Sequence, residues 1–301
     1  MNWNDFISPN TGLLFYKLLY KQWVILDKLA IENGELKFKI SDKGKSPFDD
    51  FYKIIYGADL EPIPQRGNID PIELTTIYPG LLVGSGYSHY TKARGDASLG
   101  FYFDHTTGLP VIPGSSVKGV LRSAFEKANG NYVKELLKSI LEEDKKEENN
   151  SMTSKEKMEK LWEPAKETGK ALPRIVWHIF EGKGYIEKNG KNVWDYLPMH
   201  QRDVFLDAFP VKVKNKLLGN DYITPHKDKD GNYNPLKNPN PIQFLKVMPG
   251  VTFRFEFILR DFRDENGNTL ITADNKRDLF KDILQDLGIG AKTNVGYGQF
   301  K

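Results

Sequence analysis

The last sixteen residues of the sequence read Asp286-Leu-Gly-Ile-Gly-Ala-Lys-Thr-Asn-Val-Gly-Tyr-Gly-Gln-Phe-Lys301. Four of them are glycines, spaced around a single Lys-Thr pair. Glycine takes backbone angles that other residues avoid, and it lets a backbone N–H approach an anion closely. Apolar residues at helical spacing, from Leu279 to Leu287, come before the glycines. The pattern therefore predicts a helix that ends at Gly288 and runs into a glycine-rich loop.

A glycine-rich loop of this kind has three interpretations. A nucleotide-binding P-loop needs a glycine directly before its Lys-Thr pair and a helix after it. Here Ala291 precedes Lys292, and the helix comes before the loop, which is the reverse of the order in P-loop and dinucleotide folds. A tight turn into a last short strand and a glycine-rich cradle for a polynucleotide backbone both stay open.

Composition sets broad limits. A chain of 301 residues forms one large domain or two, and 39% hydrophobic with 12% aromatic residues is enough for a sizeable core. The absence of cysteine excludes disulfides and thiolate metal sites. The sequence shows no signal peptide and no long apolar run, so we expect a cytoplasmic protein with no membrane partner. A net charge of +3 neither demands nor forbids nucleic acid, because clustering on one face matters more.

Residues 1–70 are interpreted as an N-terminal helical extension, with helices expected near residues 13–26 and 48–56. Their aromatic density favours a core or a subunit contact over a ligand site. The main domain is expected to span residues 71–301, and its first strand is predicted to begin at Ile72.

The second informative stretch reads Pro113-Gly-Ser-Ser-Val-Lys-Gly-Val-Leu-Arg122. It predicts a helix in which Ser115 or Ser116 caps the N-terminus. Lys118 and Arg122 lie one turn apart, close to the free N–H groups and the positive dipole of the helix start. The spacing suits a phosphate clamp, and a solvated basic face on an ordinary helix is the alternative.

Hydrophobic periodicity and turn residues assign the other elements. The pattern predicts a hairpin over 101–112, a helix over 132–141, a mobile charged segment over 142–160, a strand or short helix over 175–180, a central strand over 203–209, an irregular segment over 220–241, a strand over 251–259 and a helix over 274–287. The insertion in the domain is placed near 131–170 and is expected to be charged and helical, with helix resuming around Leu161 and Trp162. This order of strands and helices fits an α+β fold of ferredoxin-like type, similar to RRM domains, whose sheet can bind RNA.

Several motifs in a fixed order resemble the RAMP superfamily of CRISPR proteins. They are residues 112–122, residues 207–210, residues 224–226 and the terminal residues 288–298. The resemblance covers about residues 70–301. More narrowly, the sequence resembles the sixth-named RAMP subunits of type III-B (Cmr) effector complexes.

The resemblance implies a ferredoxin-like RAMP core and a non-catalytic, structural RNA-binding subunit. Such a subunit binds the 3′ part of the guide RNA and target duplex in antiviral defence. Its partners are the CRISPR guide RNA, the target RNA, other RAMP subunits and the small helical subunit. Carried over by motif, the expected RNA-binding residues are Ser115, Ser116, Lys118, Gly119 and Arg122, with Gly290, Lys292, Thr293, Asn294, Gly296 and Tyr297 in the loop. Lys92 and Arg94, two cations in the flexible stretch 84–95, complete this set.

Within the loop, the glycines are expected to present backbone N–H groups to RNA, so that Gly290→Val or Gly296→Val impairs RNA binding or assembly while the domain still folds. Tyr297 is expected to pack inward rather than to stack on a base.

Two alternatives stay open. One is a metal-free endoribonuclease that processes guide RNA, with His89 as the best candidate for the general acid or base. The other is a pure protein–protein scaffold. No cofactor or metal is expected, because no cluster of histidine and carboxylate residues has ligand spacing, and residues 228–231 lack the distal glutamate of a calcium loop.

Overall fold

The computed structural model describes residues 29–32, 35–38, 64–84, 98–99, 101–143, 152–167, 170–223 and 242–301. Near the N-terminus, β1 (Leu29–Glu32) and β2 (Glu35–Phe38) form an antiparallel hairpin that the sequence analysis did not identify. The helices expected near residues 13–26 and 48–56 lie outside the described residues. So do Lys92, Arg94 and His89.

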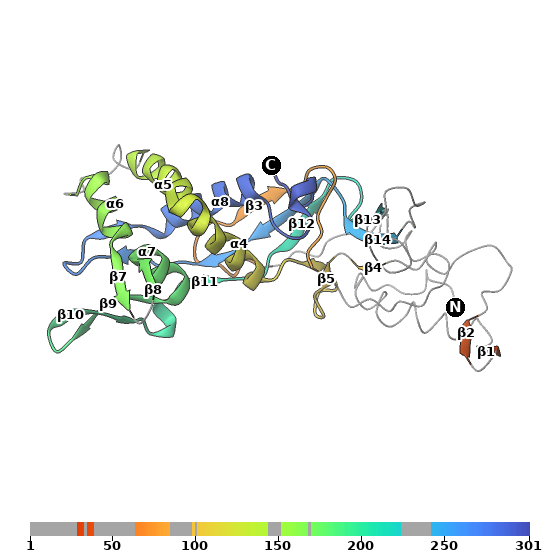
Figure 1. Ribbon diagram of the computed structural model, residues 1–301, viewed down its shortest axis with the longest axis horizontal. Coiled ribbons are helices and arrows are strands. Elements are labelled where there is room, and N and C mark those ends of the chain that lie inside the picture. The colour runs from red at the N-terminus through yellow and green to blue at the C-terminus, as the bar shows by residue number, and fades with distance from the viewer. Residues whose placement is uncertain are drawn as a thin grey trace.

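The central sheet has three strands in the order β12 (Phe209–Val213), β15 (Val251–Phe255) and β3 (Ile72–Thr75), all antiparallel (Figure 1). The C-terminal residues extend it. Thr75 and Lys301 exchange two backbone hydrogen bonds of 2.9 and 3.0 Å, so the end of the chain pairs with the free edge of β3. The predicted last short strand is thus reduced to a bridge between Thr76 and Phe300.

Alternating burial explains why β3 and β15 form the middle of the sheet. In β15 the buried side chains are Val251, Phe253 and Phe255, and every second residue faces outward. The strand predicted over 251–259 is confirmed, although it breaks at Glu256 and resumes as β16 (Phe257–Ile258).

The single strand predicted over 203–209 is wrong. The structure has β11 (Val204–Phe205), which pairs with β16, and then β12, which begins at Phe209. Pro210 lies inside β12, where the register shifts next to it. A proline is tolerated there because β12 is the outer strand of the β12-β15-β3 sheet.

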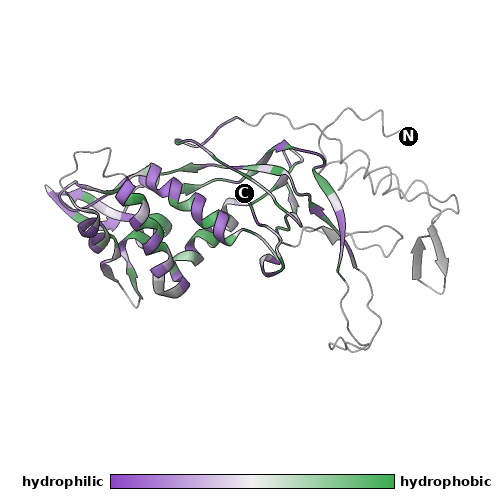
Figure 2. Ribbon diagram, turned by 90° about the horizontal axis from the view of Figure 1, so that it is seen from above, coloured by the Kyte–Doolittle hydropathy of each residue, from purple (hydrophilic) through white to green (hydrophobic). Residues whose placement is uncertain are grey.

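Helices α4 (Gly114–Glu126), α5 (Asn131–Glu143) and α8 (Ala273–Leu287) pack against one another along one side of the long strands (Figure 2). Each is amphipathic, and their apolar faces join the sheet in one continuous core. The helices predicted over 132–141 and 274–287 are confirmed. A capping box between Thr272 and Asn275 starts α8, and Gly288, with φ 65°, ends it as predicted.

The charged segment 142–160 is not wholly irregular, so this prediction is wrong for its second half. Helix α6 (Ser154–Trp162) begins with a capping box in which Thr153 and Glu156 exchange hydrogen bonds. Trp162 then stacks on Phe125 at the end of α4, with 6.2 Å between ring centroids. The 3-10 helix η3 (Lys127–Gly130) joins α4 to α5.

Beyond α6 the chain forms short elements at one end of the molecule (Figure 1). They are β7 (Pro164–Glu167), β8 (Lys170–Pro173), α7 (Arg174–Val176), the π-helical turn η5 (Trp177–Glu181), β9 (Lys183–Lys188), β10 (Lys191–Tyr196), the 3-10 helix η6 (Met199–Gln201), β17 (Phe262–Arg263) and β18 (Thr269–Ile271). Residues 175–180 are therefore helical. The strand interpretation of this stretch is wrong and the helical alternative is right, because an apolar run of this length has no decisive period.

The remaining strands lie toward the other end. Strands β5 (Tyr102–Phe103) and β6 (Pro110–Val111) form the predicted hairpin. A second small sheet has the order β13 (Leu218–Ile223), β14 (Ile242–Val247) and β4 (Ser98–Leu99). Residues 220–223 are thus a strand rather than part of an irregular segment, and the rest of that segment lies outside the described residues. Among the described helices, none has the length and apolar character needed to cross a membrane.

Candidate functional site

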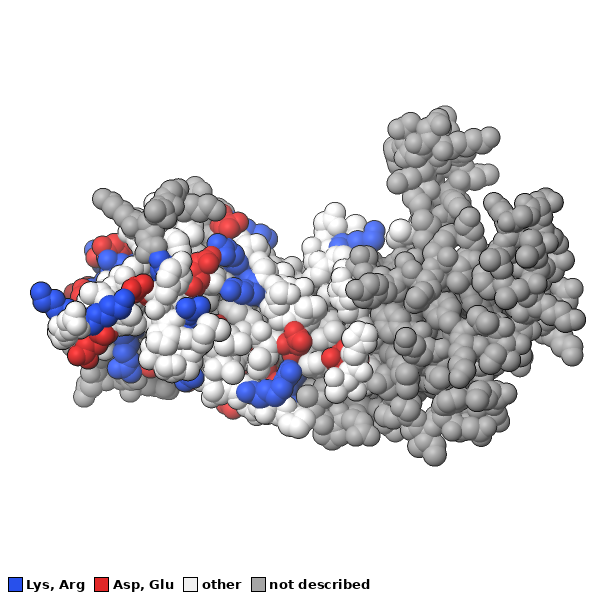
Figure 3. Space-filling model, turned by 90° about the horizontal axis from the view of Figure 1, so that it is seen from below, with Lys and Arg blue, Asp and Glu red and all other residues white. Residues whose placement is uncertain are grey.

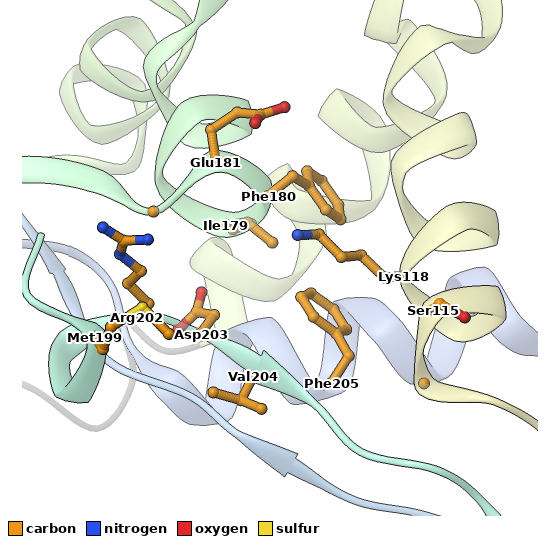
Figure 4. A pocket seen from close by; sticks show the side chains of 12 residues that line it. Ser115, Lys118, Ile179, Phe180, Glu181, Met199, Arg202, Asp203, Val204 and Phe205 are labelled. Atoms are coloured by element: carbon orange, nitrogen blue, oxygen red, sulfur yellow. The ribbon is translucent and has the colours of Figure 1, made fainter. Parts of the chain in front are cut away.

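A pocket of about 350 Å³ opens beside the first turns of α4 (Figure 4). Its walls come from three separate stretches of the chain: the start of α4, the end of η5 with Gly182, and residues 199–205, which include η6 and β11. The lining residues are Gly114, Ser115, Lys118, Ile179, Phe180, Glu181, Gly182, Met199, Arg202, Asp203, Val204 and Phe205. Two residues of the expected RNA-binding set, Ser115 and Lys118, therefore face one cavity.

The start of α4 is not capped as predicted. Neither Ser115 nor Ser116 caps the helix, whose N-cap is Pro113 with no side-chain cap bond. Instead, the Asp207 carboxylate accepts a hydrogen bond of 2.7 Å from the N–H of Gly114. A Cβ at Gly114 would lie 2.3 Å from the carbonyl oxygen of Phe205, so the close approach of the two segments needs glycine.

The cations of the pocket have no carboxylate partner within the described part of the chain. Lys118 extends over the ring of Phe205, with its Nζ atom 5.8 Å from the ring centroid. Arg202 donates from Nε to the carbonyl oxygen of Leu197 at 2.7 Å and lies over Tyr196. Both side chains thus keep positive charge at the cavity wall.

The acids of the pocket, by contrast, are paired with cations that do not line it. Glu181 accepts from Arg122 at 2.5 Å. Asp203 binds Lys276 at 2.6 Å, and both of these side chains are fully buried. Burial raises the pKa of Asp203 and lowers the pKa of Lys276, while their attraction opposes both shifts. The wall therefore carries a local excess of positive charge.

This excess is local rather than part of a broad basic stripe. Figure 3 shows Lys and Arg interspersed with Asp and Glu over the described atoms of the face it presents. Arg122, the expected second half of the phosphate clamp with Lys118, is held by Glu181. Its contact with RNA stays a prediction, but Arg202 is the cation that shares the pocket with Lys118. Gly119 lies on the exposed side of α4, with open space where a Cβ would stand.

The glycine loop is bonded tightly to the rest of the protein. The N–H of Ala291 donates to the carbonyl oxygen of Leu82 at 2.7 Å, and the N–H of Gly298 donates to Gly80 at 2.8 Å. A Cβ at Gly290 would lie 2.1 Å from the carbonyl oxygen of Leu82, at a φ of 107°. The expectation that Gly290→Val leaves the fold intact is therefore wrong, because this glycine allows close backbone packing inside the protein.

Gly296 also has a positive φ, of 95°, and a Cβ there would lie 3.3 Å from Cδ of Pro79. A valine at this position would therefore be strained as well. The expectation that Gly296→Val leaves the fold intact does not hold either.

The exposed part of the loop is its tip, around the 3-10 helix η7 (Thr293–Val295). Lys292 and Asn294 are exposed there, and Thr293 is half-buried. The structure thus presents three of the expected loop residues to the surroundings.

Tyr297 packs inward as predicted, with 8% of its surface exposed. Its hydroxyl donates to Asp221 Oδ2 at 2.6 Å, and its ring meets the edge of Phe244 at 6.3 Å. Burial and the hydrogen bond to Asp221 raise the pKa of Tyr297. The residue is thus part of the fold in this structure, and it is not presented as a stacking platform.

A second pocket, of about 430 Å³, lies between the β9–β10 region and the segment 260–267. Its buried histidine, His178, stacks on Phe262 with 4.3 Å between centroids and pairs its Nδ1 with the carbonyl oxygen of Lys183 at 3.0 Å. Burial, with the charge of Lys276 nearby, lowers the pKa of His178. No group of three or more histidine or carboxylate side chains suited to a metal ion occurs among the described residues.

Sequence reasoning missed two residues of the first pocket region. Asp207 lies in a motif that was identified, yet its role as the cap of α4 depends on a contact across 93 positions. Arg202 had no sequence signal, because it is a lone cation in an irregular segment.

Comparison with known proteins gives the class. The family model described as the RAMP superfamily matches residues 73–301. The chain belongs to the RAMP superfamily.

The curated relatives are more specific but distant. The chain is 28% identical over 221 residues to the CRISPR system Cmr subunit Cmr6 of Pyrococcus furiosus, an alignment that covers 64% of this chain and 58% of the relative. It is 27% identical over 115 residues to the CMR subunit Cmr6 of Saccharolobus solfataricus, covering 38% of this chain and 37% of the relative. The chain thus spans less than two thirds of the length of these relatives. The resemblance found in the sequence is confirmed as distant homology to Cmr6 subunits.

The chain has weaker similarity to solved structures. The type III-B Cmr-beta complex bound to cognate target RNA contains a chain with 24% identity and a TM-score of 0.43, covering 77% of this chain and 57% of that one. The crystal structure of Cmr6 from Pyrococcus furiosus has 22% identity and a TM-score of 0.31, covering 77% of this chain and 97% of that one.

Proposed function

We propose that this protein is a Cmr6-like, non-catalytic structural subunit of a type III-B CRISPR effector complex. In this role it binds the 3′ part of the guide RNA and target duplex in antiviral defence. The RAMP superfamily assignment over residues 73–301 and the similarity to two Cmr6 subunits support the proposal. Its partners are guide and target RNA, other RAMP subunits and the small helical subunit.

The core of the domain is proposed to be ferredoxin-like. The support is the order of the sheet, in which the C-terminal residues pair with β3, β3 with β15 and β15 with β12, all antiparallel. Helix α4 lies between β3 and β12 along the chain, and α8 lies between β15 and the C-terminal residues. Two strand–helix–strand halves with interleaved strands are the arrangement of that fold.

The observation that carries RNA binding is the position of Lys118. It lies on the second turn of α4, lines an open pocket and has no carboxylate partner within the described residues. A cation held in place without a protein counter-ion suits a phosphate. Ser115, Ser116, Gly119 and Arg122 are proposed to lie along the same RNA path, and Lys292, Thr293 and Asn294 to meet RNA at the loop tip.

The test is the salt dependence of RNA binding by the full chain. Lys118→Ala is expected to weaken binding to unrelated RNA sequences equally and to reduce the slope of log K against log salt by about one unit, because one phosphate contact is lost. Lys138→Ala is the matched control, since Lys138 is an exposed lysine on α5 whose ion pair is a long one, with Glu142 at 4.0 Å. If Lys118→Ala and Lys138→Ala have the same RNA affinity and the same salt dependence, the assignment of Lys118 as an RNA contact is refuted.

The same experiments separate the alternatives. If the full chain binds no RNA yet joins other RAMP subunits, the scaffold interpretation replaces this one. If the protein is a nuclease, the purified protein cuts guide precursor RNA and His89→Ala stops the cutting. The proposal predicts no cutting, and intact target cleavage when the His89→Ala variant is assembled into the complex.

A further inference from the structure

We infer that the pocket beside α4 holds one unpaired nucleotide of the bound RNA, with its base inside the pocket and its phosphate on Lys118 and Arg202. This inference rests on the proposed RNA-binding function and adds a base-binding site to it. The motive is the combination of charge, apolar surface and size in one cavity.

The charge of the side chains that line the pocket favours an anionic ligand. Both cations that line the pocket lack a carboxylate partner within the described residues, whereas both lining acids are neutralised from outside by Arg122 and Lys276. Figure 4 shows Lys118 and Arg202 reaching the cavity from separate elements. Two such cations facing one cavity favour an anionic ligand, and Arg and Lys are the usual partners of RNA phosphates.

The apolar surface calls for a flat or hydrophobic group next to that anion. Met199 lines the mouth with 75% of its surface exposed, an uncommon state for a large apolar side chain. Phe180 and Phe205 lie deeper and stack on each other at 5.9 Å. A nucleobase inserted here would cover these side chains and lie close to aromatic rings, as bases do in single-strand binding proteins.

Size and polarity agree with one base rather than a peptide segment. A volume of about 350 Å³ is near the lower end for small-ligand pockets, which suits a single nucleotide and excludes a helix or strand. Beside the two cations, the lining carries the hydroxyl of Ser115, which can both donate and accept a hydrogen bond. The edge of a base needs both kinds of partner, whereas an acidic peptide side chain needs donors only.

The test uses the full chain and single-stranded RNA of guide length, in which one base at a time is removed to leave an abasic site. One position is expected to stand out, with binding about 5- to 150-fold weaker when its base is missing, the range expected for loss of one stacked base. Met199→Glu, at an exposed residue that does not threaten folding, places a carboxylate at the mouth of the pocket and is expected to remove this position dependence. Met199→Gln, of similar size and without the charge, is the control and is expected to keep it.

The outcomes separate this inference from the proposed function. If removing a base changes the RNA affinity equally at every position, while Lys118→Ala still weakens binding, the pocket assignment is refuted and the phosphate contact is retained. If Met199→Glu leaves the dependence of RNA binding on base position unchanged but weakens binding of another RAMP subunit, the pocket takes a protein side chain and the inference is refuted. If the wild-type chain binds no RNA, both proposals fall.

Discussion

Asp207 caps the first helix of the core from 93 positions away, by accepting a hydrogen bond of 2.7 Å from the backbone N–H of Gly114. The contact joins two motifs that the sequence analysis had identified separately. It also fixes β11 beside the first turn of α4, since Phe205 lies directly against Gly114. The pocket exists because these two segments are held together.

We predict that Asp207→Ala lowers the free energy of unfolding by about 1 kcal/mol, the usual effect of losing a helix N-cap. Asp207→Asn keeps an acceptor oxygen and is expected to lose only a part of this. Urea unfolding of the three proteins measures the difference. Equal losses in both variants would show that the charge, and not the hydrogen bond to Gly114, matters.

The two kinds of glycine in the RNA-binding set are expected to respond in opposite ways to alanine. Gly290→Ala places a Cβ 2.1 Å from the carbonyl oxygen of Leu82 at a φ of 107°, so it destabilises the fold. Gly119→Ala adds a Cβ into open space on α4, so it stabilises the helix by about 1 kcal/mol.

Thermal unfolding of both variants checks the folding effects. RNA binding then tests the site: if Gly119 faces RNA, Gly119→Ala weakens binding although the protein is more stable. A more stable variant with unchanged affinity would remove Gly119 from the RNA-binding set.

Local patterns predicted the elements whose causes are local. Helix α8 has a clear apolar period and ends at Gly288, and β15 alternates strictly, so both were found from the sequence. The end of helix α6 was expected around Leu161, but its start was missed because charged residues outweigh apolar ones there, although Thr153 and Glu156 gave a readable capping-box signal.

Features with distant causes could not be predicted. The chain over 203–209 has a strand-like composition, yet it is interrupted where Asp207 turns to cap α4. Arg202 joins Lys118 in the pocket only because the fold brings η6 next to α4. The composition of a sequence does not reveal which cation lacks a counter-ion, since that depends on which acids are already paired.

The buried pair of Asp203 and Lys276 offers a test of how the pocket floor is built. Both side chains are fully buried, and Lys276 also donates to the carbonyl oxygen of Arg260 at 2.6 Å. Asp203→Ala leaves the lysine charge buried without its partner and is expected to cost about 3–5 kcal/mol. Combining Asp203→Leu with Lys276→Met removes both charges and is expected to recover most of that loss. Urea unfolding of the single and double variants measures this coupling, and a double variant as unstable as the single one would contradict it.

The last prediction concerns the acid sensitivity of the segment behind the glycine loop. Asp221 accepts hydrogen bonds from Tyr297 at 2.6 Å and from Lys246 at 2.5 Å. Burial raises the pKa of Asp221, but these hydrogen bonds outweigh it and hold the pKa below the usual 3.8. A carboxylate with a depressed folded-state pKa stabilises the protein above its unfolded pKa, and this stabilisation is lost as pH falls through the folded value.

We therefore expect the unfolding free energy of the wild type to fall more steeply below pH 3.8 than that of Asp221→Asn, which has no carboxylate to protonate there. Tyr297→Phe removes one of the two donors and is expected to cost about 1 kcal/mol at neutral pH. Because the ring of Tyr297 faces Phe244 and not the surroundings, the same variant is expected to bind RNA as well as the wild type does. Urea unfolding across the acid range and RNA binding at neutral pH measure the two effects. A Tyr297→Phe protein of unchanged stability but weakened RNA binding would mean that this side chain turns outward to meet RNA, and that the inward packing is not its working position.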